Sequence, residues 1–153
     1  MSLFKVSIIV LILLLLFGGI FYFQYAKTNL YNKTITIDKQ TFNIQVVQKP
    51  LEMERGLSGR TKIADDQGML FLFENKGDHA FWMKEMNFPL DMIFLDDNKI
   101  VSITQNAPAP TSPTSSLPLY RSAQPANKVL EINAGLSKKY DFKVGDTVTL
   151  PAK

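Results

Sequence analysis

The sequence of 153 residues contains no cysteine and only one histidine, His79. The lack of cysteine excludes disulfide bonds and a lipid anchor attached to cysteine. Zinc and copper sites rely largely on cysteine and histidine ligands, so this composition argues against both metals. The acidic pairs Asp65-Asp66 and Asp96-Asp97 lack the spacing of a calcium-binding loop and are typical of turns. The sequence therefore predicts no metal site and no cofactor.

Clustered positive charge is also missing. The formal net charge is +3, and no run of basic residues is longer than the pair Lys138-Lys139. Nucleic-acid binding requires a basic patch or stripe on one face of the domain. We therefore expect no nucleic-acid partner.

A long uncharged segment, in contrast, is present near the N-terminus. Residues 6–26 carry no charge and would extend about 31 Å as a helix, which matches the hydrocarbon core of a bilayer. The segment is longer than the apolar part of a cleavable signal peptide and lacks the small residues of a cleavage site. It predicts a membrane anchor at residues 1–27 that contacts the lipid bilayer through residues 6–26, with a removed signal peptide as the alternative.

The anchor also sets the expected location. Lys27, Lys33 and Lys39 follow the segment, and a count of flanking charges would favour the alternative of a C-terminal domain inside the cell. Long domains, however, are translocated largely regardless of such charges, and an anchor at the extreme N-terminus more often delivers its domain outward. We therefore expect a single-pass protein of the cell membrane whose C-terminal domain is extracytoplasmic. A connector at residues 28–33 would join the anchor to a β domain at residues 34–153.

The β domain is predicted from short runs of apolar or alternating residues that are separated by turn residues. Strands are expected at residues 34–37, 41–46, 68–73, 81–84, 90–95, 99–104, 128–132 and 146–150. Asp38-Lys39-Gln40 suits a hairpin turn, and Pro50–Arg55 suits a short helix that ends at Gly56. Many short strands with regular turns favour a mainly β fold, a single antiparallel β-sandwich or barrel with short helical turns, preceded by one N-terminal transmembrane helix.

Residues 107–125 differ from the rest of the domain. These nineteen residues include five prolines and show neither a strand nor a helix period. A loop of this length is usually a functional lid or a mobile linker. Tyr120 lies late in this loop, where it could fold over a binding site, although a disordered loop is an equal alternative.

Several sequence blocks occur together in a fixed order: RGL (55–57), GMLFLF (68–73), FWMK (81–84), PLDMIF (89–94), VLEINAG (129–135) and VGD (144–146). Over residues 34–150 this order resembles the bacterial and archaeal family known as domain of unknown function 192. The resemblance implies a compact, mainly β domain that is often exported, and it implies no established activity. Relatives usually have asparagine after FWMK, where this chain has Glu85.

The candidate site lies in the segment FWMKEMNFPLDMIF (81–94), where charged residues interrupt an apolar run. In a strand at 81–84, Trp82 and Lys84 would share one face, and a hairpin with residues 90–95 would bring Asp91 close to Lys84. The simpler interpretation is a cross-strand ion pair that contributes roughly 0.2–1 kcal/mol. The functional interpretation is a half-buried cleft in which these three side chains meet a ligand.

Two arginines extend the candidate site. Arg55 and Arg60 flank Gly56-Leu57-Ser58-Gly59, and a guanidinium group can bind a carboxylate or phosphate through two hydrogen bonds. The alternative is that one of them ties the short helix to a carboxylate of the protein. Ser58 is not expected to be a nucleophile, because the second glycine comes too early for a nucleophile elbow.

Three functions remain open. The first is the binding of a small polar or anionic ligand, such as a sugar or an envelope fragment, by Trp82, Lys84, Asp91, Arg60, Arg55 and Tyr120. The second is a hydrolase that uses Asp91 or Glu85 as acid or base. The third is a protein-interaction module at the membrane that presents a β edge or the proline-rich loop. Because no nucleophile, base and orienting group come together in the sequence, binding is favoured over catalysis, and no catalytic residue is assigned.

Overall fold

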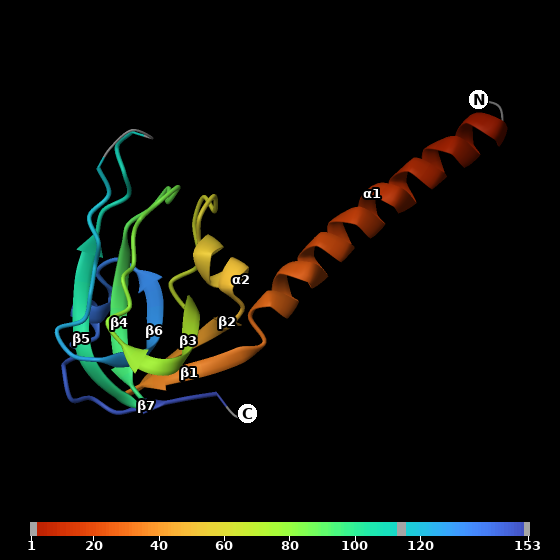
Figure 1. Ribbon diagram of the computed structural model, residues 1–153. Helices are drawn as coiled ribbons and strands as arrows, with labels where there is room; N and C mark the ends of the chain where they lie inside the picture. The colour runs from red at the N-terminus through yellow and green to blue at the C-terminus, as the bar shows by residue number, and fades with distance from the viewer. Residues whose placement is uncertain (1–2, 113–115, 152–153) are drawn as a thin grey trace. The chain divides into compact units, whose positions relative to one another are not determined.

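The computed structural model describes residues 3–112 and 116–151, and it divides the chain into two compact units, Met1–Asn32 and Lys33–Lys153 (Figure 1). The first unit contains one helix, α1 (Leu3–Leu30). Its side chains are described at residues 8–20, 22 and 30. The second unit contains every strand of the described chain.

The predicted transmembrane helix is contradicted by the structure. Among the described residues, no helix is both long enough and apolar enough to cross a membrane. The predicted single-pass location, with the C-terminal domain outside the cell membrane, is contradicted by the same finding.

The second unit is built on one sheet of seven strands. Its elements follow in the order β1 (Lys33–Ile37), β2 (Gln40–Val47), α2 (Pro50–Arg55), β3 (Gln67–Gly77), β4 (Leu90–Asp96), β5 (Lys99–Ala107), β6 (Ala126–Asn133), α3 (Leu136–Lys139) and β7 (Val148–Thr149). The strand order in the sheet is β5-β4-β6-β3-β2-β1-β7, and the sheet curls into a half-barrel (Figure 1). Backbone hydrogen bonds from Ile100 to Asp146 and from Gly145 to Ile100 connect the start of β5 to the segment before β7.

The predicted antiparallel sandwich or barrel is therefore wrong, although the fold is mainly β. All strands lie in one sheet, and β2 pairs with β3 in parallel, with Gln45 opposite Met69. A parallel pair needs a long crossover connection, and residues 48–66, which include α2, provide it. Alternation within a strand indicates which side chains share a face, but it does not indicate the direction of the neighbouring strand.

Both faces of the central strands are buried. On one face, Leu70 of β3, Ile93 of β4 and Leu130 of β6 belong to an apolar cluster that includes residues of β1, β7 and α3. On the other face, which we call the loop-covered face, Phe71 and Phe94 pack against side chains from residues 57–63 and 81–88. Burial on both sides explains why these strands read as continuous apolar runs.

Several local predictions are confirmed. The helix α2 spans Pro50–Arg55 and ends at Gly56, whose φ of 50° suits glycine, and Lys49 provides no side-chain cap. The predicted hairpin is the β1–β2 pair, with Asp38 in its turn at a φ of 52°.

The predicted strand at 81–84 is not formed. In its place, Phe81 alone makes a backbone bridge with Tyr120, with N···O distances of 2.9 and 2.8 Å.

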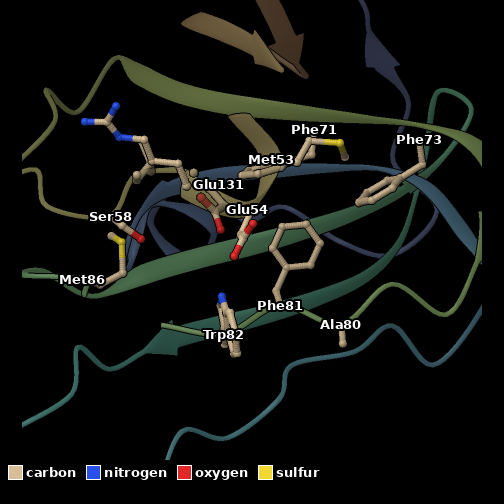
Figure 2. A pocket seen from close by; sticks show the side chains of 13 residues that line it. Met53, Glu54, Ser58, Phe71, Phe73, Ala80, Phe81, Trp82, Met86 and Glu131 are labelled. Carbon is tan, nitrogen blue, oxygen red and sulfur yellow. The ribbon is translucent and has the colours of Figure 1, made fainter. Parts of the chain in front are cut away.

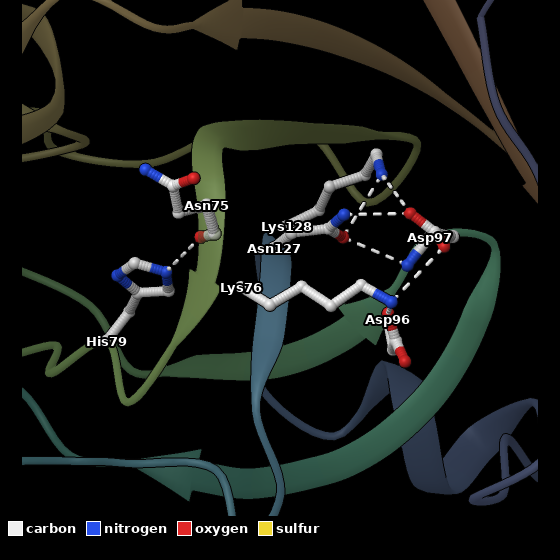
Figure 3. A network of polar contacts seen from close by, with 7 residues as sticks. All are labelled: Asn75, Lys76, His79, Asp96, Asp97, Asn127 and Lys128. Carbon is white, nitrogen blue, oxygen red and sulfur yellow. Dashed lines mark hydrogen bonds and ion pairs between the residues drawn. The ribbon is translucent and has the colours of Figure 1, made fainter.

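The turn between β4 and β5 is held by a polar network at one end of the sheet (Figure 3). Lys76 of β3 makes ion pairs with both Asp96 and Asp97. Asn127 of β6 accepts a hydrogen bond from the backbone N–H of Asp97 (2.9 Å) and donates one to its carboxylate (2.8 Å). The acidic pair is therefore engaged with the neighbouring strands, in agreement with its interpretation as a turn.

Candidate functional site

Asp91, the acidic member of the predicted site, is a structural residue. Its side chain is 0% exposed, and its carboxylate accepts four hydrogen bonds. The donors are the backbone N–H groups of Asn106 (2.8 Å), Gly135 (3.1 Å) and Ser137 (2.9 Å), and the Ser137 hydroxyl (2.6 Å). The carboxylate thus joins β4 to β5 and to the start of α3, so the predicted pairing with Lys84 does not form.

Trp82 and Lys84 do lie together, at the surface. Trp82 is 45% exposed, and the Lys84 ammonium lies 5.5 Å from the centre of its indole ring. Such a cation–π contact contributes about 0.5–1 kcal/mol at an exposed position. With Arg55, both residues line a shallow cleft of about 220 Å³, which we call the outer cleft; Leu51, Glu54, Ser58 and Glu85 complete its lining.

The outer cleft adjoins a deeper cavity of about 270 Å³, with which it shares Glu54, Arg55, Ser58 and Trp82 (Figure 2). This space lies on the loop-covered face, and we call it the Glu131 cavity. Its other lining residues are mainly apolar or aromatic: Met53, Gly56, Leu57, Phe71, Phe73, Ala80, Phe81, Met86 and Glu131. Phe71 and Phe81 meet edge to face, with ring centres 5.0 Å apart.

Glu131 is the buried acid of this cavity. It lies in the middle of β6, opposite Met69 of β3 and Met92 of β4, and it is only 4% exposed. Burial raises the pKa of its carboxyl group to about 8, while the positive charge of Arg60 acts in the opposite direction. Within the part of the chain that the structure describes, no group makes a hydrogen bond or an ion pair with the Glu131 side chain.

Two loops are joined to form one wall of the cavity. The Ser58 hydroxyl donates a hydrogen bond to the carbonyl of Lys84 (2.8 Å), and the Gly59 N–H donates one to the carbonyl of Glu85 (2.9 Å). The Asn87 side chain donates a hydrogen bond to the carbonyl of Arg60 (2.9 Å). These contacts fix the segment after α2 against the turn that carries Trp82.

Glu85 adopts a left-handed backbone conformation in that turn, with a φ of 57°. Asparagine enters this region more readily than glutamate, because its short polar side chain compensates for the strain locally. The departure from the FWMKN pattern that the family resemblance implied therefore falls at a position where the backbone itself favours asparagine.

Arg60 and Tyr120, the other predicted binding residues, do not line either hollow. Arg60 is partly buried, and its guanidinium donates a hydrogen bond of 2.6 Å to the side chain of Gln45. Tyr120 forms the backbone bridge with Phe81 and packs against the core of the loop-covered face. The structure thus brings Trp82, Lys84 and Arg55 together and leaves Asp91, Arg60 and Tyr120 outside the cavity lining.

The acids proposed for a hydrolase do not share a site. Asp91 is enclosed by four hydrogen-bond donors, whereas Glu85 is exposed and lines only the outer cleft. His79 stacks on Phe73 with ring centres 3.6 Å apart. Across residues 3–112 and 116–151, no three His, Asp or Glu side chains cluster in a way that could hold a metal ion.

Glu131 and Glu54 were not among the site residues predicted from the sequence. A usable signal was present for Glu131, because it is the one charged residue within an apolar strand segment, VLEI (129–132). Charged side chains are rarely fully buried unless they are paired. An acid within the otherwise apolar part of a predicted strand was thus a stronger indication of a site than the charges of segment 81–94.

Comparisons with known proteins agree on the fold and provide no activity. No curated protein matches the chain. A crystal structure of a protein of unknown function from Novosphingobium aromaticivorans is similar, with a TM-score of 0.69 and 30% identity over 76% of this chain and 83% of that one. A protein from Sinorhizobium meliloti that has been suggested to be a transcription regulator has a TM-score of 0.66 and 34% identity, over 77% of this chain and 90% of that one.

The family resemblance that the sequence blocks indicated is confirmed. The matching family model has the description Uncharacterized ACR, and the match begins at the first residue of β1 and ends one residue beyond β7. It thus contains every strand of the sheet as well as the lining of the Glu131 cavity. Over residues 33–150, this chain belongs to the DUF192 family of uncharacterised proteins.

Proposed function

We propose that the domain binds a small polar ligand in the Glu131 cavity. The observation that carries this proposal is the Glu131 carboxyl group, which is 4% exposed, faces the cavity and has no hydrogen-bond partner in the described chain. The Glu131 oxygens are not among the fully enclosed unpaired atoms of the described chain, so a molecule in the cavity can reach them. A ligand with a polar group at this depth would supply the hydrogen bonds that the protein does not.

The size of the cavity suits a small molecule. An apolar cavity of about 150 Å³ is sufficient to hold benzene. The Glu131 cavity, at about 270 Å³, has room for a ring of that size and a short polar substituent. Ligand sites generally combine apolar walls with a few polar groups. Here Phe71 and Phe81 belong to the apolar wall, and Glu131 provides a polar group.

The stability of the fold does not explain why a glutamate stands at position 131. The neighbours of Glu131 on the adjacent strands, Met69 and Met92, are buried and apolar, and a glutamine or a valine would be less costly at the same position. The acid also argues against the anionic ligand expected from the sequence, because the ionised form of Glu131, which prevails above a pH of about 8, would repel a negative group in the cavity. The outer cleft, with Lys84 and Arg55, remains available to an anionic substituent.

Fluorescence of Trp82, the only tryptophan, reports on this cavity directly. We would titrate the protein with benzyl alcohol and with methyl glucoside, and we expect at least one of these neutral probes to change the emission saturably. Ala80→Phe should abolish the change, because Ala80 lines the cavity and a phenyl ring there would fill it. Ala123→Phe, at an exposed position outside the lining, is the matched control.

The two probes separate the kinds of polar ligand. A response to methyl glucoside alone would indicate a sugar, and a response to benzyl alcohol would indicate an aromatic body. If neither these two probes nor the charged probes benzamidinium and benzoate change the Trp82 emission, or if Ala80→Phe and Ala123→Phe respond alike, the proposal is wrong.

A further inference from the structure

Resting on the proposed function, we infer that the ligand of the Glu131 cavity is an organic cation, with an ammonium or amidinium group on an apolar or aromatic body. The juxtaposition behind this inference is a pair of carboxyl groups facing aromatic rings across one small cavity.

The first part is the pair of acids. Glu131 of β6 and Glu54 of α2 point toward the same space, as Figure 2 shows. Glu131 is almost completely buried, whereas Glu54 is exposed at the entrance. A cation that enters would approach Glu54 first and then Glu131, and a charged hydrogen bond to a carboxylate is about twice as strong as a neutral one.

The second part is the aromatic wall. Phe81 and Trp82 lie across the cavity from the two acids in Figure 2, and Phe71 and Phe73 also line it. The faces of aromatic rings attract cations, and sites for organic cations commonly combine such rings with carboxylates. The indole of Trp82 already has the ammonium group of Lys84 within 5.5 Å, so it can act as a partner for a cation.

The positive charges near the cavity are compatible with the binding of a cation. Arg55 is exposed at the entrance, where solvent and salt screen it. Arg60 lies outside the lining and donates to Gln45, but its charge favours the ionised form of Glu131. A ligand cation would add to this effect from inside the cavity, so binding would convert Glu131 from its neutral to its charged form.

A matched series of probes tests the inference: benzamidinium, neutral benzyl alcohol and benzoate, each titrated into the full chain at pH 7 with Trp82 emission as the readout. We expect benzamidinium to bind about tenfold to a hundredfold more tightly than benzyl alcohol, as removal of a hydrogen bond to a charged group usually costs. Benzoate should bind most weakly. Glu131→Gln should reduce the preference for benzamidinium to about twofold or less and leave benzyl alcohol unchanged.

Proton release is a second readout, and a merely structural role of Glu131 would not produce it. Because the pKa of Glu131 is about 8 in the free protein, benzamidinium binding at pH 7 should release close to one proton, and binding at pH 9.5 should release very little. Calorimetry in two buffers with different heats of ionisation measures this number. Glu131→Gln should abolish the release, and Glu74→Gln, an exposed acid outside the cavity, should leave it unchanged.

The outcomes separate the inference from the proposed function. If benzyl alcohol binds as tightly as benzamidinium, the preference for a cation is excluded, and if Glu131→Gln keeps that preference, its recognition by Glu131 is excluded. In either case the inference is wrong and the binding function stands. If none of the three probes nor methyl glucoside binds, while circular dichroism shows a folded protein, both the inference and the proposed function are wrong.

Discussion

At the residue scale, the burial of Glu131 is unfavourable for folding, and the same burial places its carboxyl group where a ligand in the cavity can contact it. It lies between two buried methionines of the adjacent strands, and burial keeps its carboxyl group protonated at neutral pH. A neutral carboxyl group both donates and accepts hydrogen bonds, whereas the ionised form accepts only. The same side chain can therefore present two different surfaces to a ligand, depending on pH and on what enters the cavity.

The raised pKa of Glu131 predicts a pH-dependent stability. Between pH 4.5 and about 8 the unfolded chain releases this proton and the folded protein retains it, so the free energy of unfolding falls as the pH rises. The contribution of the Glu131 proton to the free energy of unfolding is fully present below pH 4.5 and is lost by about pH 8. The shift corresponds to about 5 kcal/mol, at 1.36 kcal/mol for each pH unit.

Glu131→Gln should remove this dependence. We expect urea denaturation to give similar free energies of unfolding for the variant and the parent protein at pH 4.5. At pH 9 the variant should be more stable by several kcal/mol, because glutamine has no proton to retain. Glu74→Gln, at an exposed position, is the control and should follow the parent protein at every pH. Parallel profiles for Glu131→Gln and the parent protein would contradict the raised pKa.

At the scale of elements, the features that depend on local sequence were predictable and those that depend on distant partners were not. The hairpin β1–β2 and the helix α2 follow from turn residues, alternation and an initial proline. The role of Asp91 does not, because its hydrogen-bond donors lie 15, 44 and 46 residues away in the chain. The strand predicted at 81–84 does not form for a related reason. The backbone partner of Phe81 is Tyr120, which lies far along the chain in the proline-rich loop.

Asp91→Asn tests the role of this carboxylate in joining three elements. The amide group of asparagine would place an N–H₂ where three backbone N–H groups and the Ser137 hydroxyl now donate, so buried donors would lose their acceptor. We expect a loss of about 2–4 kcal/mol in the free energy of unfolding, measured by urea denaturation. Asp38→Asn, in the exposed β1–β2 turn, should change stability by less than about 0.5 kcal/mol. Equal small effects at both positions would show that Asp91 is not a structural acid.

At the scale of the whole molecule, the composition and the regular turns predicted a mainly β domain, but not its strand order. The parallel pairing of β2 with β3 places α2 and the following loop over one face of the sheet, and this crossover provides one side of the Glu131 cavity. Glu54 and Ser58 come from the crossover, Trp82 from the segment after β3, and Glu131 from β6. The cavity thus depends on an arrangement that local sequence patterns do not contain, which is why sequence analysis found its rim and not its acid.

The division of the chain at Lys33 leads to the last prediction. Both buried apolar clusters consist of residues from Ile35 onward, and the DUF192 match begins at residue 33, so a fragment of residues 33–153 retains the whole described core. We expect its free energy of unfolding to agree with that of the full chain within about 0.5 kcal/mol, and its Trp82 response to benzyl alcohol to be the same.

A fragment of residues 38–153 is the control, because it lacks β1 and therefore the buried side chains of Ile35 and Ile37. Its loss should be at least about 4 kcal/mol, since removal of each such side chain typically costs 2–5 kcal/mol. If the longer fragment were as unstable as the shorter one, residues before Lys33 would be part of the folding unit.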